Sequence, residues 1–193
     1  MIKRTLLILG ALALALSVRA ETYKIDPVHS TIGFSVRHLV SKFSSRFTSV
    51  SGTVSYDAAA PQASSVEATV EIKSINTNNE KRDGHLLSAD FFDGAKFPVA
   101  TFKSTAWKKT GDDTFDVTGD LTIKGVTKPV VFKVTLTGTG PGMGGATVSG
   151  WEATTKINKS DFGVNGPAML AKALGDEVTL DISIEADYKP EAK

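Results

Sequence analysis

The chain of 193 residues contains no cysteine. Disulfide bridges and thiolate metal sites are therefore excluded, together with the small secreted scaffolds that depend on disulfides. Histidine is scarce, with three residues at positions 29, 38 and 85. Their spacings match no metal-binding template such as HExxH, so we expect no metal site and no cofactor.

A long apolar run of membrane-spanning length is also missing. Lys3 and Arg4 precede an apolar run over 6–16, which is too short for a comfortable membrane span and is followed by Val18-Arg19-Ala20. This pattern predicts a signal peptide over residues 1–20, a single domain over 21–193 and export of that domain. Because no cysteine follows the run, a lipid anchor at the cleavage site is not available.

The sequence has no strong excess of basic residues. The formal net charge is +1, and it becomes slightly negative once Lys3, Arg4 and Arg19 leave with the signal peptide. We therefore expect no nucleic-acid partner. The absence of internal repeats and low-complexity linkers favours one compact unit.

Catalytic motifs are few. No Gly-x-Ser-x-Gly elbow occurs, and the glycine-rich stretch 138–145 lacks the Lys-Ser/Thr and the helix of a phosphate loop, which makes it a hairpin loop. Asp83 with His85, or Asp26 with His29, could form an acid/base pair. Residues two apart in a short helix point to different faces, so structural hydrogen bonds are the simpler interpretation.

The dominant feature is apolar/polar alternation at a period of two. It indicates strands with one dry face and one wet face. We expect eight strands, near 31–38, 46–56, 65–74, 98–107, 114–124, 127–138, 146–158 and 177–188. Turn residues at 125–127 and 111–113 predict two hairpins, and the whole is expected to be an all-β, eight-stranded antiparallel β-barrel.

Two segments, 78–92 and 167–174, break the alternation and are predicted as short helices. Each could close one end of the barrel and control ligand access. Each could equally be a satellite of the core.

Ten phenylalanines and two tryptophans supply large apolar side chains. Any single one is most simply core filling. The aromatic residues near basic side chains would also suit an amphiphile with its tail inside and its head group at the rim.

Eight short motifs in order carry a resemblance. They are IDPVHS at 25–30, FSVRH at 34–38, RDGHL at 82–86, DFFD at 90–93, FP at 97–98, TFKS at 101–104, GDLTIKGVTKPV at 119–130 and KSDFG at 159–163. In this set the chain resembles the YceI-like family. One departure is Lys159, at a position where many relatives have arginine. Lysine keeps the charge but cannot make the bidentate contact of an arginine.

The resemblance implies a periplasmic binding or carrier protein of lipocalin-like fold rather than an enzyme. Its ligand would be a polyisoprenoid or related long-chain amphiphile, such as an isoprenoid quinone, a polyprenyl phosphate or a fatty amide. The alternatives are a stress-protective structural protein with a filled core, and a small non-metal isomerase or hydrolase using Asp83 and His85.

Strand parity and chemistry together select candidate ligand-binding residues. The tail channel is predicted from Phe34, Val36, Phe43, Phe47, Phe91, Phe92, Phe102, Leu121, Ile123, Phe132 and Trp151. The head-group end is predicted from His38, Arg46, Arg82 and His85. A homodimer and a transient contact with a membrane are compatible with the sequence, which decides neither.

Overall fold

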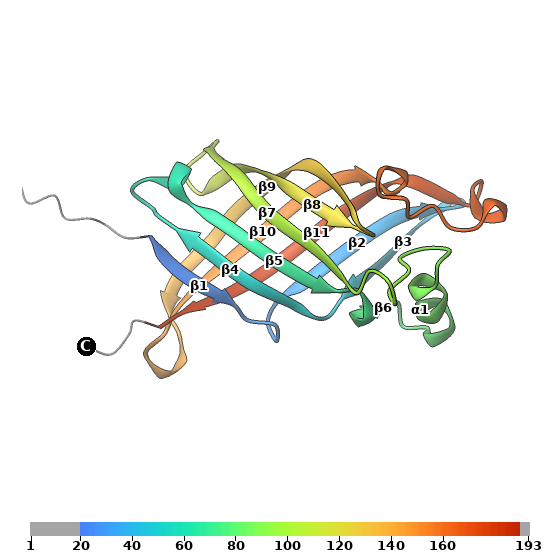
Figure 1. The fold of residues 1–193 in the computed structure, drawn as a ribbon. Helices are drawn as coiled ribbons and strands as arrows, with labels where there is room; N and C mark the ends of the chain where they lie inside the picture. Colours follow the sequence, from blue (N-terminus) through green and yellow to red (C-terminus); the bar gives the residue numbers. More distant parts are fainter. Residues whose placement is uncertain (1–19, 190–193) are drawn as a thin grey trace, which may run out of the picture.

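The computed structural model describes residues 20–189, so the predicted signal peptide falls outside the described residues except for Ala20. The strands are antiparallel and wrap around a common axis (Figure 1). They are β1 (Glu21–Ile25), β2 (Thr31–His38), β3 (Ser41–Phe47), β4 (Val50–Tyr56), β5 (Ser65–Glu71), β6 (Ile75–Asn76), β7 (Val99–Lys109), β8 (Thr114–Ile123), β9 (Val126–Pro141), β10 (Thr147–Asn158) and β11 (Leu174–Tyr188). The helix is α1 (Glu80–Leu87), and the 3-10 turns are Pro61–Ala63, Ile72–Ser74, Met143–Gly145, Lys159–Phe162 and Ala168–Leu170.

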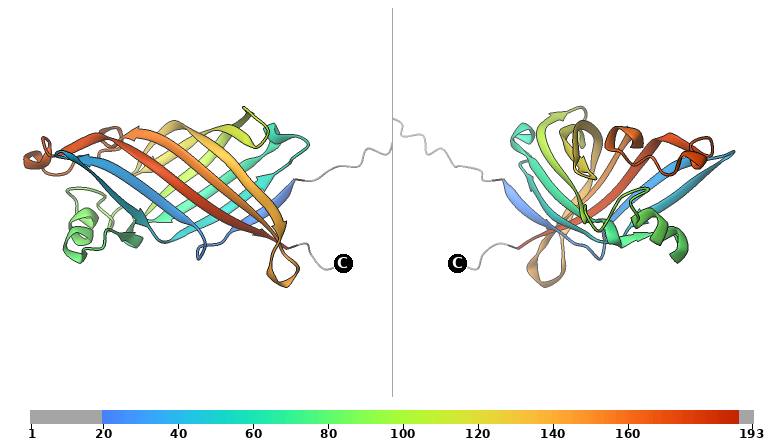
Figure 2. Two further views of the ribbon diagram at one scale, coloured as in Figure 1. Left: turned by 180° about the vertical axis from the view of Figure 1, so that it is seen from behind. Right: turned by 45° about the vertical axis from the view of Figure 1, so that its right-hand side comes forward.

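Eight strands close into a barrel, which confirms the predicted fold class, although the ring contains β1 and the predicted strand 31–38, which is β2, lies outside it. The hydrogen-bonded order is β1-β4-β5-β7-β8-β9-β10-β11, and pairing of β1 with β11 completes the ring. Strands β2, β3 and β6 extend the sheet beyond β11 at one end. α1 lies at that end, beside β3 and β6, in every view (Figures 1 and 2).

The junction between β1 and β2 is a loop at 26–30 that bulges out of the barrel wall. Both strands pair with the same edge of β11, β1 at Ala186 and β2 at residues up to Ser183. Between them, the Ser30 hydroxyl donates to the Glu185 carbonyl at 3.2 Å and accepts from the Glu185 N–H at 3.1 Å. The Ser30 side chain thus takes the place of a backbone pair in the ladder, at the loop where Pro27, which lacks an N–H, interrupts the strand.

The strand predictions require three corrections. The predicted strand 46–56 is wrong, because the chain changes partner at residues 48–49 and forms the separate strands β3 and β4. The short strands β1 and β6 were missed. The β8–β9 turn lies at Lys124 and Gly125, with φ of 50° and 76°, one residue before the predicted position, because Ile123 pairs directly with Val126.

The two helical segments are shorter than predicted. Only Glu80–Leu87 is α-helical, and it begins where the Asn79 side chain accepts from the Arg82 N–H at 3.0 Å. Within 167–174 only Ala168–Leu170 forms a 3-10 turn, and Leu174 already begins β11. Over residues 20–189, no helix is both long and apolar enough to cross a membrane.

Aromatic side chains fill the end of the barrel away from α1. Trp151 packs edge-on against Tyr56 and Trp107, with ring centroids 5.1 Å and 5.9 Å away, and Trp107 contacts Phe115 at 5.6 Å. Trp107, Phe115 and Trp151 are all buried. This end is a packed core, and Trp107 and Trp151 also face the space inside the barrel.

We expect Ser30→Ala to destabilise the fold by about 1–3 kcal/mol, because it leaves the Glu185 N–H without a partner where the serine is 5% exposed. Denaturant unfolding measures the change. Ser41→Ala removes an exposed hydroxyl from the β2–β3 hairpin and should cost less than about 0.5 kcal/mol. Equal losses in the two variants would show that Ser30 is not a structural bridge.

Candidate functional site

A cavity of about 160 Å³ lies inside the barrel; we call it the inner chamber. Its lining is apolar apart from Thr101 and comes from both sides of the barrel, with Phe102, Leu121 and Phe132 on one side and Ile182 on another. These side chains point inward because alternate residues of a strand face the same side. A chamber of this size and polarity holds a small hydrocarbon group and excludes water.

A second cavity, of about 390 Å³, forms the mouth chamber at the end near α1. It shares Phe47, Phe92, Ile123 and Leu180 with the inner chamber. The two spaces therefore adjoin through a ring of four apolar side chains. The mouth chamber alone falls in the usual size range of small-molecule sites.

Aromatic rings connect the rim to the inner chamber. Phe34 lies 6.4 Å from Phe43 and 5.6 Å from Phe47, and Phe47 lies 5.7 Å from Phe92, all measured between ring centroids. Phe43, at the outer end, lies under the Arg82 guanidinium at 4.6 Å. The sequence of contacts runs from a charged rim to an apolar interior.

Arg82 is held in place by α1 and the segment before it. Its Nε donates to Thr77 Oγ1 at 2.9 Å and its Nη2 to the Thr77 carbonyl at 2.7 Å. Asp83, the next residue, accepts from the Thr77 N–H at 2.9 Å. The guanidinium is therefore positioned at the rim before any ligand arrives.

The ionisable side chains that line the mouth chamber are all of the basic types. They are His38, Lys42, Arg82, His85 and Lys159. His85 Nε2 lies 2.9 Å from the Asp90 carboxylate, and Lys159 Nζ donates to the Asn165 carbonyl at 3.3 Å. The rim can thus offer donors and positive charge to a polar or anionic head group.

The segments around 88–97 and 159–166 cover part of the mouth. Lys124 Nζ donates to the Ala89 carbonyl at 3.2 Å and the Gly163 carbonyl at 3.1 Å, which ties the two segments together. Between them Phe91 and Phe162 are buried against Leu121. These turn-rich segments are therefore tied to the β8–β9 turn, and they overlap or adjoin the predicted helical segments 78–92 and 167–174.

The structure places all eleven predicted tail residues on the lining of one chamber or both. Phe34, Val36, Phe43 and Phe91 line the mouth chamber, Phe102, Leu121, Phe132 and Trp151 the inner one, and Phe47, Phe92 and Ile123 both. Of the head-group residues, His38, Arg82 and His85 line the mouth chamber. Arg46 lies on the outer face of β3, since Phe43 and Phe47 occupy its inward positions, and it lines neither chamber.

Sequence reasoning omitted other lining residues. Leu180 and Ile182 belong to an alternating strand whose parity points them inward, so the signal for them was present. Phe162 and Leu170 sit in irregular turns, where no period indicates a direction.

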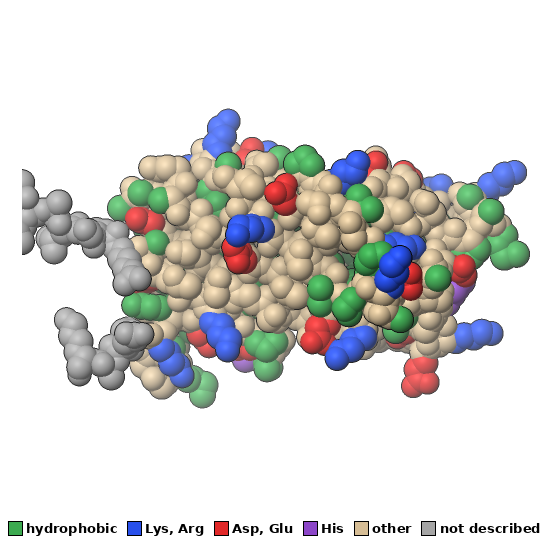
Figure 3. Space-filling view, in the orientation of Figure 1, with side chains coloured by type: hydrophobic (Ala, Val, Ile, Leu, Met, Phe, Trp, Pro, Cys, Tyr) green, Lys and Arg blue, Asp and Glu red, His purple; other side chains and the backbone are tan. Residues whose placement is uncertain are grey.

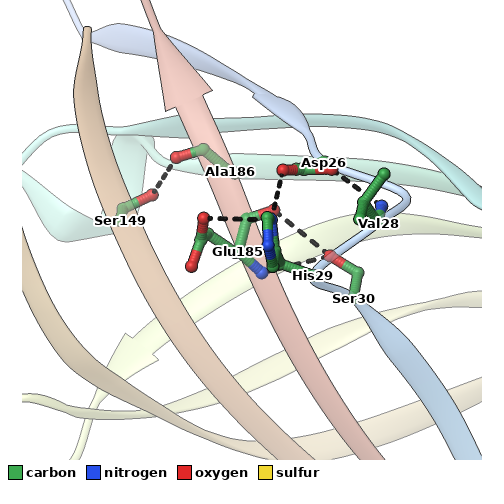
Figure 4. Close-up of polar contacts among 7 residues, drawn as sticks. All are labelled: Asp26, Val28, His29, Ser30, Ser149, Glu185 and Ala186. Atoms are coloured by element: carbon green, nitrogen blue, oxygen red, sulfur yellow. Dashed lines mark hydrogen bonds and ion pairs between the residues drawn. The ribbon is translucent and has the colours of Figure 1, made fainter. Parts of the chain in front are cut away.

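The two carboxylate–histidine pairs, Asp83 with His85 and Asp26 with His29, differ in the structure. Asp83 and His85 share no hydrogen bond among the described contacts, because Asp83 binds Thr77 and His85 binds Asp90. Asp26 and His29 are in contact, with Nδ1 2.7 Å from the carboxylate and 3.6 Å from Glu185, on the outside of the barrel (Figure 4). This pair stabilises the 26–30 loop and lies outside both chambers.

Geometry and topology define this chain as a closed antiparallel barrel that encloses an apolar cavity with a basic mouth. The sequence profile of the YceI-like domain matches residues 23–186, and the chain belongs to that family. A UPF0312 protein of Pseudomonas fluorescens (strain SBW25) is 44% identical over 191 residues, covering 96% of this chain and 97% of its own.

Solved structures agree with the fold. The YCEI protein of Campylobacter jejuni is 31% identical with a TM-score of 0.69, covering 78% of this chain and 88% of its own. A polyisoprenoid binding domain from Saccharophagus degradans is 17% identical with a TM-score of 0.67, covering 86% of this chain and 98% of its own.

The pKa of His29 is raised above 6.5, first by its hydrogen bond with Asp26 and then by the charges of Asp26 and Glu185. The pKa of Asp26 is lowered by the same hydrogen bond. Because the folded pKa of His29 is the higher one, its stabilising contribution is complete below the unfolded value and is lost as pH rises through the folded value. We expect Asp26→Asn to return the His29 pKa toward 6.5, which an NMR titration of its ring protons measures.

The control is Asp120→Asn, which removes a carboxylate on β8 and should leave the His29 titration unchanged. A His29 pKa insensitive to Asp26→Asn would contradict the assigned pairing.

Proposed function

We propose that this protein binds a long-chain amphiphile of the polyisoprenoid class inside the barrel and carries it through the periplasm, without catalysis. The observation that carries the proposal is the pair of adjoining apolar chambers, open at one end to a rim of basic and hydrogen-bonding side chains. The Saccharophagus degradans domain of similar fold is described as polyisoprenoid binding, which supports the same ligand class here.

The energetics favour an enclosed tail. Each buried CH₂ group gains about 0.8 kcal/mol relative to water, so a chain of several isoprene units is strongly held out of solvent. A membrane offers the same apolar surroundings. Selection by this protein would therefore come from the shape of the chambers and from head-group contacts at the rim.

The chambers also set a limit on the tail. The inner chamber is similar in size to an engineered cavity of about 150 Å³ that accepts benzene. Beyond it, Trp107, Phe115 and Trp151 fill the barrel. The innermost end of the tail would thus occupy the inner chamber, and the following units the mouth chamber.

The filled-core alternative explains only the half of the barrel that contains the tryptophans. A dry, apolar cavity in a core costs stability, because its walls lose contacts that a filled core would make. Binding of a tail would restore those contacts.

We expect the purified protein to retain a long-chain isoprenoid amphiphile after expression in bacteria. Native mass spectrometry should show a mass above that of the polypeptide, and solvent extraction should release the lipid for identification. Ligand-free protein that also takes up no lipid on incubation would refute the proposal.

Leu180→Trp tests the position of the tail, because Leu180 belongs to the ring shared by the two chambers. The indole would fill that ring, so we expect bound lipid to fall at least about tenfold, while overpacking costs about 1–3 kcal/mol of stability. The matched control is Val131→Trp, which adds an indole at an exposed position on β9. Normal lipid content in the Leu180→Trp variant would place the tail elsewhere.

A further inference from the structure

The tip of the β2–β3 hairpin exposes two large apolar side chains. His38 pairs with Ser41, so Leu39 and Val40 alone make the turn. Leu39 is 56% exposed and Val40 fully exposed. Most two-residue hairpin turns carry glycine, asparagine or aspartate there, because these tolerate the backbone and the water.

Leu39 also adopts a φ of 51°, in the left-handed region that a leucine rarely occupies. A leucine at this position therefore strains the backbone. Because the side chain is exposed, packing against the barrel offsets little of that strain. Backbone strain of this kind is typical of positions where the side chain has a functional contact.

Met169 adds a third apolar side chain on the neighbouring segment. It is 85% exposed in the turn Ala168–Leu170. The Leu39 N–H donates to the Ala173 carbonyl at 2.7 Å, which fastens the hairpin tip to this segment. The two segments lie together at one end of the barrel in every view (Figures 1 and 2).

Basic side chains surround these apolar ones. Arg37 and Lys42 are directly opposite each other across the hairpin, and Lys172 lies on the neighbouring segment. Within residues 20–189 none of the three is in an ion pair. The carboxylates nearest in sequence are engaged, Asp176 with Ser160 and Glu177 with Lys156.

Two like charges facing each other across a hairpin destabilise it. An anionic partner would relieve that repulsion. In the space-filling view, hydrophobic and basic side chains are visible at this end of the molecule, next to acidic side chains and a histidine (Figure 3).

The same elements border the mouth chamber. His38, Ser41 and Lys42 of the hairpin and Leu170 and Leu174 of the neighbouring segment line it. A surface that contacted the tip would therefore lie beside the opening through which a ligand enters or leaves.

We propose that Leu39, Val40 and Met169, with Arg37, Lys42 and Lys172 around them, form a docking edge for the surface of an anionic lipid bilayer. The apolar side chains enter the boundary between head groups and acyl chains, and the basic ones bind anionic head groups. Docked in this way, the mouth faces the bilayer, and an amphiphile passes between bilayer and barrel without crossing water.

A second copy of the chain fits this edge less well. Two copies meeting tip to tip would bring the basic residues of each copy together, and the nearby Asp176 and Glu177 are already engaged with Ser160 and Lys156.

Co-sedimentation of the purified protein with vesicles tests the proposal, using phosphatidylcholine alone and phosphatidylcholine mixed with phosphatidylglycerol. We expect binding to the mixed vesicles that weakens as salt is added. The variant Leu39→Gly/Val40→Ser/Met169→Ser should bind at least about tenfold more weakly, from the loss of three apolar side chains. Glycine accepts the positive φ at position 39, so the melting temperature should be no lower than that of the original protein.

The matched control is Val28→Ser/Met143→Ser, which removes two exposed apolar side chains from the 26–30 loop and the β9–β10 connection. It should bind vesicles within about twofold of the original. Arg37→Gln/Lys172→Gln should lose binding to the anionic vesicles and most of its salt dependence.

No binding to anionic vesicles, or equal binding by the Leu39→Gly/Val40→Ser/Met169→Ser variant, would overturn the proposal. The original protein could instead fail to bind vesicles and form a dimer that is lost in the variant, as measured by sedimentation velocity. That result would assign the edge to self-association. Native mass spectrometry reports bound lipid separately. A protein that holds lipid but ignores vesicles thus contradicts only the docking edge, and one that binds vesicles but holds no lipid contradicts only the carrier function.

Discussion

Strand β11 pairs with two partners along a single edge, and the rest of the molecule depends on this arrangement. One edge of β11 binds β10 along its length, while the other binds β2 and then β1. At β1 the ring closes, because the other edge of β1 pairs with β4. At β2 the ring does not close, because the other edge of β2 pairs with β3, and the far edge of β3 pairs only with the two residues of β6. The barrel is therefore closed at one end and opens at the other.

This difference between the ends divides the interior. Where the ring is closed, the inward-facing aromatic residues meet across a short distance and pack as an ordinary core, which supplies cohesion to a chain without disulfides. The inner chamber lies against this core, since Trp107 and Trp151 also line it, and the mouth chamber lies toward the end where the sheet opens. The packed aromatic residues thus both stabilise the fold and form the closed end of the apolar space.

The polar groups follow the same division. At the open end, Arg82 is fixed by Thr77 and stacked on Phe43, so a charge is held at the boundary between water and the apolar chambers. On the outer wall, Asp26, His29, Ser30 and Glu185 repair the sheet where the chain leaves β1 for β2. In the sequence, Asp26 and His29 of this second group could form an acid/base pair. Their contacts in the structure instead bridge a gap in the hydrogen-bond ladder of the sheet.

Strand parity predicted much of the site. A period of two places Phe102, Leu121 and Phe132 inside the barrel wherever the ring closes, and the chambers contain them. Parity also indicates that Arg46 faces outward, next to the inward Phe47, whereas its charge alone suggested the head-group end. Residues in irregular segments, such as Phe162 and Met169, have no period, and their directions depend on hydrogen bonds from distant residues.

The sequence by itself determined the alternation, and with it the barrel, the apolar interior and most of the residues that face it, because side-chain direction in a strand is a local property of the backbone. Only the tertiary structure decided that the run 46–56 divides between two partners, that apolar chambers lie between the packed tryptophans and the mouth, and that the hairpin tip at Leu39 is hydrogen-bonded to the segment that follows Met169. These features depend on which strands share an edge and where the ring closes, and such contacts between distant segments leave no periodic trace in the sequence.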